Sequence, residues 1–213
     1  SSDVCSSDLF ENHTGVAVPI DIANCDTDQI IPARFLRKTI DDPDYATFLL
    51  HDLRFDADGE ETDFILNRDA FRAATVIVAD RNWGCGSSRE NAVTALLKNG
   101  VRVVIAPSFG DIHYNNCVKR GVLPVRLTSA ECAQLREALH AEPGAAVTIE
   151  LGAQVVRGPG NWSARFAIDP FDKERLEKGL TDIELTVAYS ADIDAFEQAR
   201  ASRLSWIDSR GAP

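Results

Sequence analysis

Residues 74–97 read ATVIVADRNWGCGSSRENAVTALL and place a strand, a glycine-rich turn and a helix in direct succession. The run 74–79 is apolar and rich in β-branched residues, which favours a buried strand. Small and apolar residues recur with helical spacing after Arg89. Gly84 and Gly86 allow the backbone to turn sharply and to approach a ligand closely. The segment therefore predicts a turn that suits a carboxylate or a phosphate.

Three polar side chains complete this turn. Ser87 and Ser88 offer hydroxyl groups, and Arg89 adds a permanent guanidinium charge. A purely structural alternative exists, because Ser87 and Glu90 have the S-x-x-E spacing of a capping box. A P-loop and a nucleophile elbow both require other residues around the glycines. An anion site and a helix cap therefore both stay open at this point.

The chain around the turn alternates short apolar strands with helices. The pattern predicts strands at 15–22, 74–79, 102–106 and 122–127, and helices at 89–99, 107–119 and 129–140. It predicts a C-terminal β-meander at 147–151, 154–157 and 164–168, followed by helices at 170–179 and 191–203. This order is typical of an α/β fold with a largely parallel sheet.

The domain organisation follows from composition. The Ser/Asp-rich residues 1–9 have no clear period and are expected to be a leader that is disordered or foreign to the fold. Residues 10–203 are expected to form a single domain, and 204–213 a C-terminal tail. Residues 41–61 are rich in Asp, Pro and Gly with aromatic residues between them, which indicates a surface excursion with some packing of its own.

Charge and cysteine content narrow the class of protein. The formal net charge of −11 argues against binding to nucleic acid or to an anionic membrane. The 5 cysteines include no C-x-x-C pair, so neither a zinc site nor a complete set of iron–sulfur ligands is expected. Reduced thiols, and the lack of any run of about 18 apolar residues, favour a cytoplasmic protein.

Two further segments carry more polar groups than a loop requires. Asn24, Asp26 and Asp28 either bind a cation or cap the next helix. Ser108 and Asp111 follow the next strand of the sheet. Because parallel strands end at one edge, these two residues are expected to face a crevice shared with the glycine turn.

His113 and Cys85 are weaker candidates for chemistry. A lone histidine in a helix usually packs or faces solvent, although its titration range suits acid–base catalysis. Cys85 has no base nearby in the sequence that would activate it as a nucleophile. We therefore assign neither residue a catalytic role.

Three segments carry a family resemblance. GCGSSRE at 84–90, DTDQIIPARFL at 26–36 and PSFGDIHYNNCVKRGVLPV at 107–125 occur in the order and spacing of the small subunits of 3-isopropylmalate dehydratase, in the aconitase superfamily. The similarity runs from about residue 10 to about residue 199. It implies a swivelling β/β/α domain that resembles the fourth domain of aconitase.

The resemblance also implies a division of labour. The large subunit would carry a four-iron four-sulfur cluster, and this chain would hold no cofactor or metal. Ser87 would be the base that removes the proton α to a carboxylate. The residues implied to bind or border the substrate are Ser88, Arg89, Arg37, Asp26 and Asp28.

The implied activity is that of a heterodimeric hydro-lyase in leucine biosynthesis. It would interconvert 2-isopropylmalate and 3-isopropylmalate through 2-isopropylmaleate, and only with its large subunit. Asn91 and His113 depart from the family, which usually has His and an aromatic residue there. A paralogue acting on another 2-substituted malate, or a non-catalytic binding protein with the same fold, therefore stays open.

Overall fold

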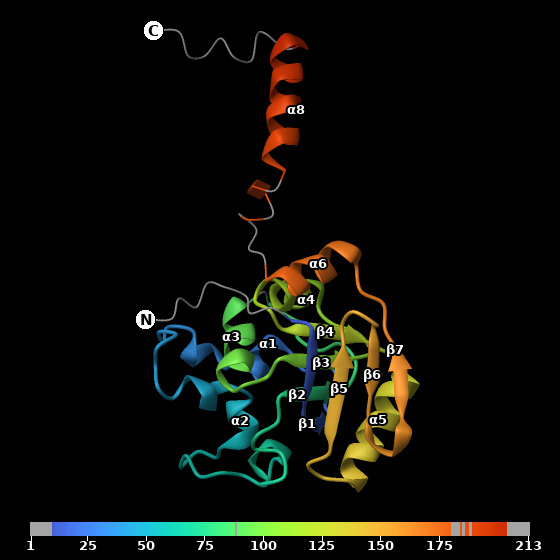
Figure 1. Cartoon of the computed structure of the whole chain (residues 1–213). Coiled ribbons are helices and arrows are strands. Elements are labelled where there is room, and N and C mark those ends of the chain that lie inside the picture. Colours follow the sequence, from blue (N-terminus) through green and yellow to red (C-terminus); the bar gives the residue numbers. More distant parts are fainter. Residues whose placement is uncertain (1–9, 88, 180–183, 185, 188, 204–213) are drawn as a thin grey trace.

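The computed structural model describes residues 10–87, 89–179, 184, 186–187 and 189–203. A seven-stranded sheet with the order β4-β3-β2-β1-β5-β6-β7 forms its centre (Figure 1). The strands are β1 (Asn12–Ile20), β2 (Val76–Ala79), β3 (Val103–Ala106), β4 (Leu123–Arg126), β5 (Ala146–Glu150), β6 (Val155–Arg157) and β7 (Ser163–Arg165). The leader and tail expected at 1–9 and 204–213 lie outside the described residues, so the expected domain limits stay predictions.

One half of the sheet is parallel, as expected. β1, β2, β3 and β4 pair in parallel, with Val18 opposite Ile77 and Ile77 opposite Val104. All four residues of β2 and all four of β3 are buried, which explains their continuous apolar runs. Pro124 lies in β4 at the sheet edge, where a missing N–H is tolerated.

The other half is the antiparallel meander β5-β6-β7, also as expected. β1 joins the two halves, because Asn12–Val16 pairs antiparallel with β5 and Ala17–Ile20 pairs parallel with β2. Its first five residues are not buried, which explains why the apolar pattern starts the strand three residues late. The expected α/β class, with a parallel sheet that continues into a C-terminal β-meander, is confirmed.

The longer helices agree closely with the sequence pattern. They are α3 (Glu90–Lys98), α4 (Asp111–Lys119), α5 (Ser129–Ala141), α6 (Pro170–Lys178) and α8 (Ser190–Arg203). Thr128 and Glu131 form a capping box at the start of α5. α5 packs against β1 and β2, and α4 packs against α3 and α6. Figure 1 shows α8 standing away from the body.

Short helical turns connect β1 with β2. They are α1 (Thr27–Ile30), η1 (Ala33–Phe35), η2 (Tyr45–Phe48), α2 (His51–Arg54) and η3 (Ile65–Asn67), and a further turn, η4 (Pro159–Asn161), lies in the meander.

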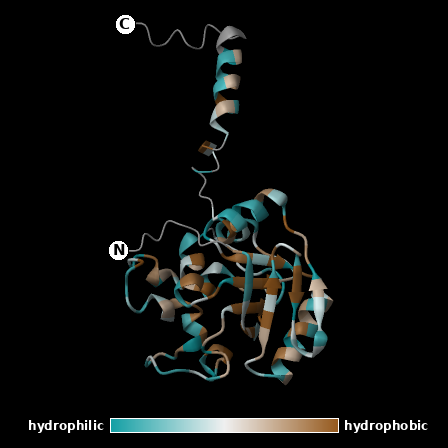
Figure 2. Ribbon diagram, in the orientation of Figure 1, coloured by the Kyte–Doolittle hydropathy of each residue, from teal (hydrophilic) through white to brown (hydrophobic). Residues whose placement is uncertain are grey.

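The acidic excursion at 41–61 packs more deeply than its composition indicates. Tyr45, Phe48 and Leu50 are buried, and η2 lies against α3. The buried Arg54 donates from Nε to Oδ1 of Asn67 at 3.0 Å and so holds the excursion together. Figure 2 shows the apolar residues concentrated on the central strands, with this excursion at their side.

Candidate active site

The glycine turn is held by the loop that follows β1. The N–H of Gly84 donates to the carbonyl of Cys25 at 2.7 Å, and the N–H of Thr27 donates to the carbonyl of Cys85 at 3.0 Å. Asp26 and Cys85 form an isolated parallel bridge. The loops after β1 and β2 are therefore paired like strands beyond the ends of the strands themselves.

The loop after β3 holds the other side of the turn. The N–H of Trp83 donates to the carbonyl of Ser108 at 3.0 Å, and the N–H of Gly110 donates to the carbonyl of Trp83 at 2.9 Å. Ser108 Oγ accepts from the N–H of Asn82 at 2.9 Å. The structure thus brings Ser108 to the glycine turn, as expected. Asp111 instead lines a separate cavity beside α4.

Glycine is required where these loops meet. A Cβ atom on Gly110 would lie 2.4 Å from the carbonyl oxygen of Gly84. Gly84 has φ +69°, and a Cβ atom there would lie 2.2 Å from Cδ2 of His113. The two backbones and the imidazole ring are therefore in direct contact, and no side chain fits between them.

Ser87 does not cap the following helix. Arg89 occupies the N-cap of α3, with φ −139° and ψ 109°, and no side chain caps this helix. The capping-box interpretation of Ser87 and Glu90 is therefore wrong, because the extended Arg89 delays the helix start until Glu90. Ser87 is exposed, and its carbonyl accepts from Oγ1 of Thr27 at 2.7 Å.

Arg89 is paired with Asp28 from the neighbouring loop. Nη1 of Arg89 lies 2.6 Å from Oδ1 of Asp28, and Nη2 lies 3.0 Å from Oδ2. The side chain of Arg89 is 16% exposed, whereas that of Asp28 is 52% exposed. The Nη2 contact is a hydrogen bond, whereas the buried Nη1 lies close to Oδ1 but has no hydrogen-bond partner among the described residues.

The polar residues 24–28 form a turn and a helix cap. Asp26 Oδ1 accepts from the N–H of Gln29 at 2.8 Å, and Gln29 Oε1 accepts from the N–H of Asp26, which completes a capping box. Asn24 Oδ1 accepts from Nδ2 of Asn82 at 2.9 Å. These bonds support the capping alternative over the cation site. No group of three potential metal ligands occurs among the described residues.

Two predicted site residues remain, Arg37 and Ser88. Arg37 is exposed after η1, and it forms no hydrogen bond or ion pair with the turn in the described part of the chain. Ser88 lies outside the described residues. The predicted roles of both residues stay predictions.

His113 supports the turn from inside the fold. It is 2% exposed, and burial lowers its pKa to about 4, so the imidazole is neutral near pH 7. Its Nε2 lies 3.5 Å from Sγ of Cys117, and its buried Nδ1 has no partner among the described residues. A neutral ring without contact to solvent is a packing element under Gly84, not a proton donor at the site.

Two contacts were not foreseen from the sequence. Asn91 Nδ2 donates to the hydroxyl of the buried Tyr45 at 3.3 Å and so joins α3 to the acidic excursion. The hydroxyl of Thr27 fixes the backbone at Ser87. Neither contact has a local signal, because the partners are 46 and 60 residues apart in the chain.

Comparisons with known proteins agree with this geometry. The Aconitase C-terminal domain family matches residues 7–130, and LeuD_N matches residues 133–170. A 3-isopropylmalate dehydratase small subunit from Rhodopseudomonas palustris (strain BisB18) is 48% identical over 200 residues, covering 93% of this chain and 99% of the relative. The chain belongs to the family of 3-isopropylmalate dehydratase small subunits.

More distant members of the family support the same assignment. The small subunit from Paramagnetospirillum magneticum is 44% identical over 199 residues, which cover 93% of this chain and 98% of the relative. The crystal structure of a 3-isopropylmalate dehydratase, LeuD, from Methanocaldococcus jannaschii superimposes with a TM-score of 0.62 at 27% identity. It covers 86% of this chain and 99% of its own. The expected resemblance and fold are therefore confirmed.

The contact between Gly110 and Gly84 leads to a stability prediction. We expect Gly110→Ala to lower the free energy of unfolding by about 2 kcal/mol, because its methyl group would collide with backbone that has to shift. Gly152→Ala is the matched control, since nothing lies within 4 Å of its Cβ position. Urea unfolding measures both, and equal stabilities would show that the loops are not packed as described.

His113 leads to a prediction for the pH dependence of stability. The pKa of His113 is about 4 in the folded chain and 6.5 as a free group. Between pH 4 and pH 6.5, this histidine is therefore protonated in the unfolded chain but neutral in the folded chain. Its contribution to stability is therefore complete above pH 6.5 and is lost as the pH falls towards 4.

We expect the free energy of unfolding of the wild type to fall by about 2 kcal/mol more than that of His113→Phe between pH 7.5 and 5. Urea unfolding at both pH values gives this difference. Parallel pH profiles for the two proteins would contradict the buried, neutral imidazole.

Proposed function

We propose that this chain is the small subunit of a heterodimeric hydro-lyase of leucine biosynthesis. With its large subunit it interconverts 2-isopropylmalate and 3-isopropylmalate through 2-isopropylmaleate. Relatives that align with this chain over nearly their whole length are named 3-isopropylmalate dehydratase small subunit. The observation that carries the proposal is the exposed Ser87 held two residues from the oriented guanidinium of Arg89.

Ser87 acts as the base that removes the proton α to a substrate carboxylate. A serine hydroxyl is a very weak acid, so its alkoxide needs a positive environment shielded from water. Arg89 supplies the charge. The backbone of the loop is held at Gly84, whose N–H donates to the carbonyl of Cys25, and at Ser87, whose carbonyl accepts from the hydroxyl of Thr27. The loop therefore needs no reorganisation at the moment of proton transfer.

Substrate carboxylate binds at Arg89 and Ser88. Asp28 orients Arg89 in the free chain, and Asp26 holds the neighbouring loop by capping α1. Arg37, on the exposed segment after η1, borders the pocket and contributes to the choice of substrate. Together these side chains form one half of a site.

The iron–sulfur cluster belongs to the partner. Among the described residues, no group of three or more His, Cys, Asp or Glu side chains is arranged so that it could hold a metal ion. The described residues do not fit the cluster. Departure of the substrate hydroxyl requires a Lewis acid, and we assign that chemistry to the large subunit's four-iron four-sulfur cluster.

The helices and the net charge bear on where the protein is located and on what it binds. No described helix is long and apolar enough to cross a membrane. We place the protein in the cytoplasm and expect it to bind neither nucleic acid nor membrane, because its formal net charge is −11.

The two departures from the family do not favour another substituted malate. Asn91 bonds to Tyr45, and His113 packs beneath Gly84, so both act within the fold and not on the exposed side of Ser87. A non-catalytic protein with this fold would have no need to keep Ser87 and Arg89 together.

The function is tested by reconstitution. The purified chain alone should be iron-free and inactive, and anaerobic mixing with a cluster-loaded large subunit should produce turnover of isopropylmalate. In that mixture we expect Ser87→Ala to lower kcat by 10² to 10⁴-fold, as is typical when an acid–base group is lost. Assembly should be unchanged.

Ser129→Ala is the matched control, since it removes an exposed serine at the start of α5. Activity above about a tenth of wild type in Ser87→Ala would refute the base assignment. Iron–sulfur absorbance or turnover in the isolated chain would refute the division between the subunits.

Arg89→Lys tests the carboxylate grip. Lysine keeps the charge but loses the planar two-point contact, so we expect KM to rise at least tenfold, equivalent to about 1.4 kcal/mol. Arg81→Lys, at an exposed position in the same connection, should leave KM unchanged. Steady-state kinetics with saturating large subunit measure both, and an unaltered KM in Arg89→Lys would place this residue outside the pocket.

A further inference from the structure

A polar cavity lies beside α4, the helix that begins directly after Gly110. Its volume is about 550 Å³, and it opens between the end of β4, the first turns of α4 and the start of α6. The side chains that decide its chemistry are Asp111, Tyr114, Arg126, Ile168, Asp169 and Asp172.

The cavity has an excess of negative charge. Three carboxylates and the guanidinium of Arg126 line it, and one of the carboxylates, that of Asp169, caps α6 by accepting from the N–H of Phe171 at 2.8 Å. The guanidinium of Arg126 lies over the ring of Tyr114, 4.3 Å from its centroid. Burial and the neighbouring Asp169 raise the pKa of Asp172, and this rise is opposed by Arg175 and Arg126. A cation entering the cavity would therefore relieve an unfavourable arrangement.

Tyr114 adds a hydroxyl group. Its side chain lines the cavity and is 9% exposed. The cavity thus offers carboxylates and a hydroxyl that together suit a guanidinium or an ammonium group.

Two exposed apolar side chains lie on the helices that flank the cavity. Ile112 of α4 is 54% exposed and Phe171 of α6 is 47% exposed. Among the described residues before position 180, no other large hydrophobic side chain is exposed. We call Ile112, Phe171 and the cavity on these two helices the α4–α6 patch.

The patch is continuous with the candidate active site. α4 begins directly after Gly110, whose N–H is bonded to the turn that carries Ser87. Arg126 is the last residue of β4, so it lies at the end of the parallel strands from which the loops of the candidate site emerge. Figure 1 shows α3, α4 and α6 along the same end of the body, where α4 contacts both other helices.

We propose that the α4–α6 patch docks the large subunit, and that a basic side chain of the large subunit, flanked by apolar side chains, enters the cavity between Asp111 and Asp172. This inference rests on the proposed function, since a partner that completes the site at Ser87 has to cover this end of the molecule. Apolar anchors around a desolvated charged contact are typical of interface hot spots. A small free cation would leave Ile112 and Phe171 exposed, whereas a protein surface buries them.

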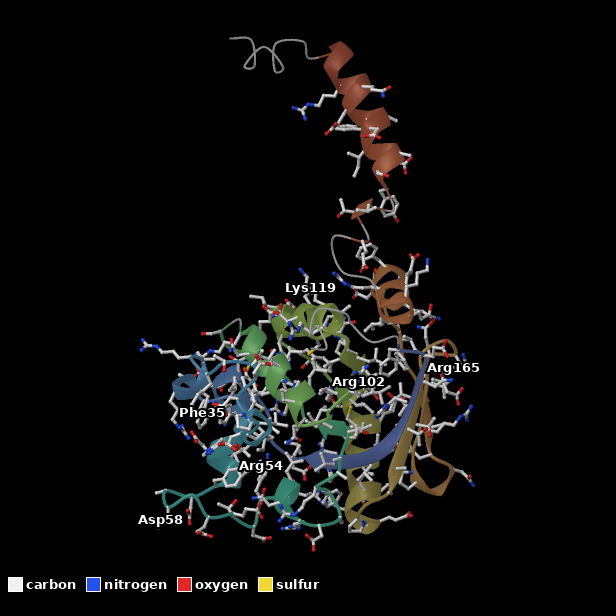
Figure 3. All side chains as sticks on the ribbon, turned by 60° about the vertical axis from the view of Figure 1, so that its left-hand side comes forward. Phe35, Arg54, Asp58, Arg102, Lys119 and Arg165 are labelled. Carbon is white, nitrogen blue, oxygen red and sulfur yellow. The ribbon has the colours of Figure 1, made fainter. Side chains whose placement is uncertain are left out.

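The test is the affinity for a cluster-loaded large subunit, measured by titrating activity under anaerobic conditions. We expect Ile112→Ser and Asp172→Lys each to raise Kd at least tenfold, with kcat at saturating large subunit within twofold of wild type. Asp58→Lys is the matched charge reversal, because Figure 3 shows Asp58 on a turn at the opposite end of the body from α4.

A folding check keeps the test decisive. If thermal unfolding shows that Asp172→Lys is not folded, Asp172→Asn replaces it. We expect Asp172→Asn to have a higher Kd than the wild type, and we expect its Kd to change less with salt concentration. If the wild type binds the large subunit and turns over substrate, and the patch variants bind with an unchanged Kd, the docking surface is overturned and the proposed function stays intact. An inactive wild-type mixture would instead refute the proposed function.

Two other occupants have distinct signatures. If the variants abolish self-association of the isolated chain but leave Kd for the large subunit unchanged, the patch contacts a second copy. If methylguanidinium binds the wild type but not Asp172→Lys, with the same unchanged Kd, the cavity is a site for a small cation. Either result would overturn the inference.

Discussion

Parallel pairing continues past the ends of β1, β2 and β3, and the candidate site depends on that continuation. Isolated bridges join Asp26 with Cys85 and Trp83 with Phe109. The loops after β1, β2 and β3 therefore continue the pairing of the sheet, whereas such loops normally separate from one another. This extension is compatible only with glycine where the backbones touch, at positions 84 and 110. The exposed Ser87 follows directly on this paired segment, and its proposed catalytic role would benefit from a backbone held in this way.

Local signals were sufficient to predict most of the framework. Continuous apolar runs predicted β2 and β3 because both faces of these strands are covered. The S-x-x-E spacing at Ser87 misled because Arg89, and not Ser87, has the extended backbone of the N-cap, so the helix starts at Glu90. The same kind of spacing is correct at Thr128, which occupies the N-cap of α5 and forms a capping box with Glu131.

Contacts between distant segments could not be predicted in this way. The position of Asp28 opposite Arg89 joins residues 61 apart, and it depends on the register of two loops. Likewise, His113 looked like a lone helical histidine, yet its ring fills the space that Gly84 leaves. The acidic composition of residues 41–61 indicated a surface segment, but Tyr45 is buried by α3 and bonded to Asn91. In each case tertiary packing decides the outcome.

The pair between Asp28 and Arg89 shows how an incomplete site can stay ordered before its partner arrives. In the free chain Asp28 is about half exposed, and such a pair contributes only about 0–1 kcal/mol because water competes for both charges. It is sufficient to orient a guanidinium, but it is weak enough to give way to a substrate carboxylate. Under the proposed function, the large subunit excludes water from this end of the sheet, and the charge of Arg89 then acts more strongly on the bound substrate and on Ser87. An anion site that becomes strong only after assembly would keep the isolated chain inactive without any change in its fold.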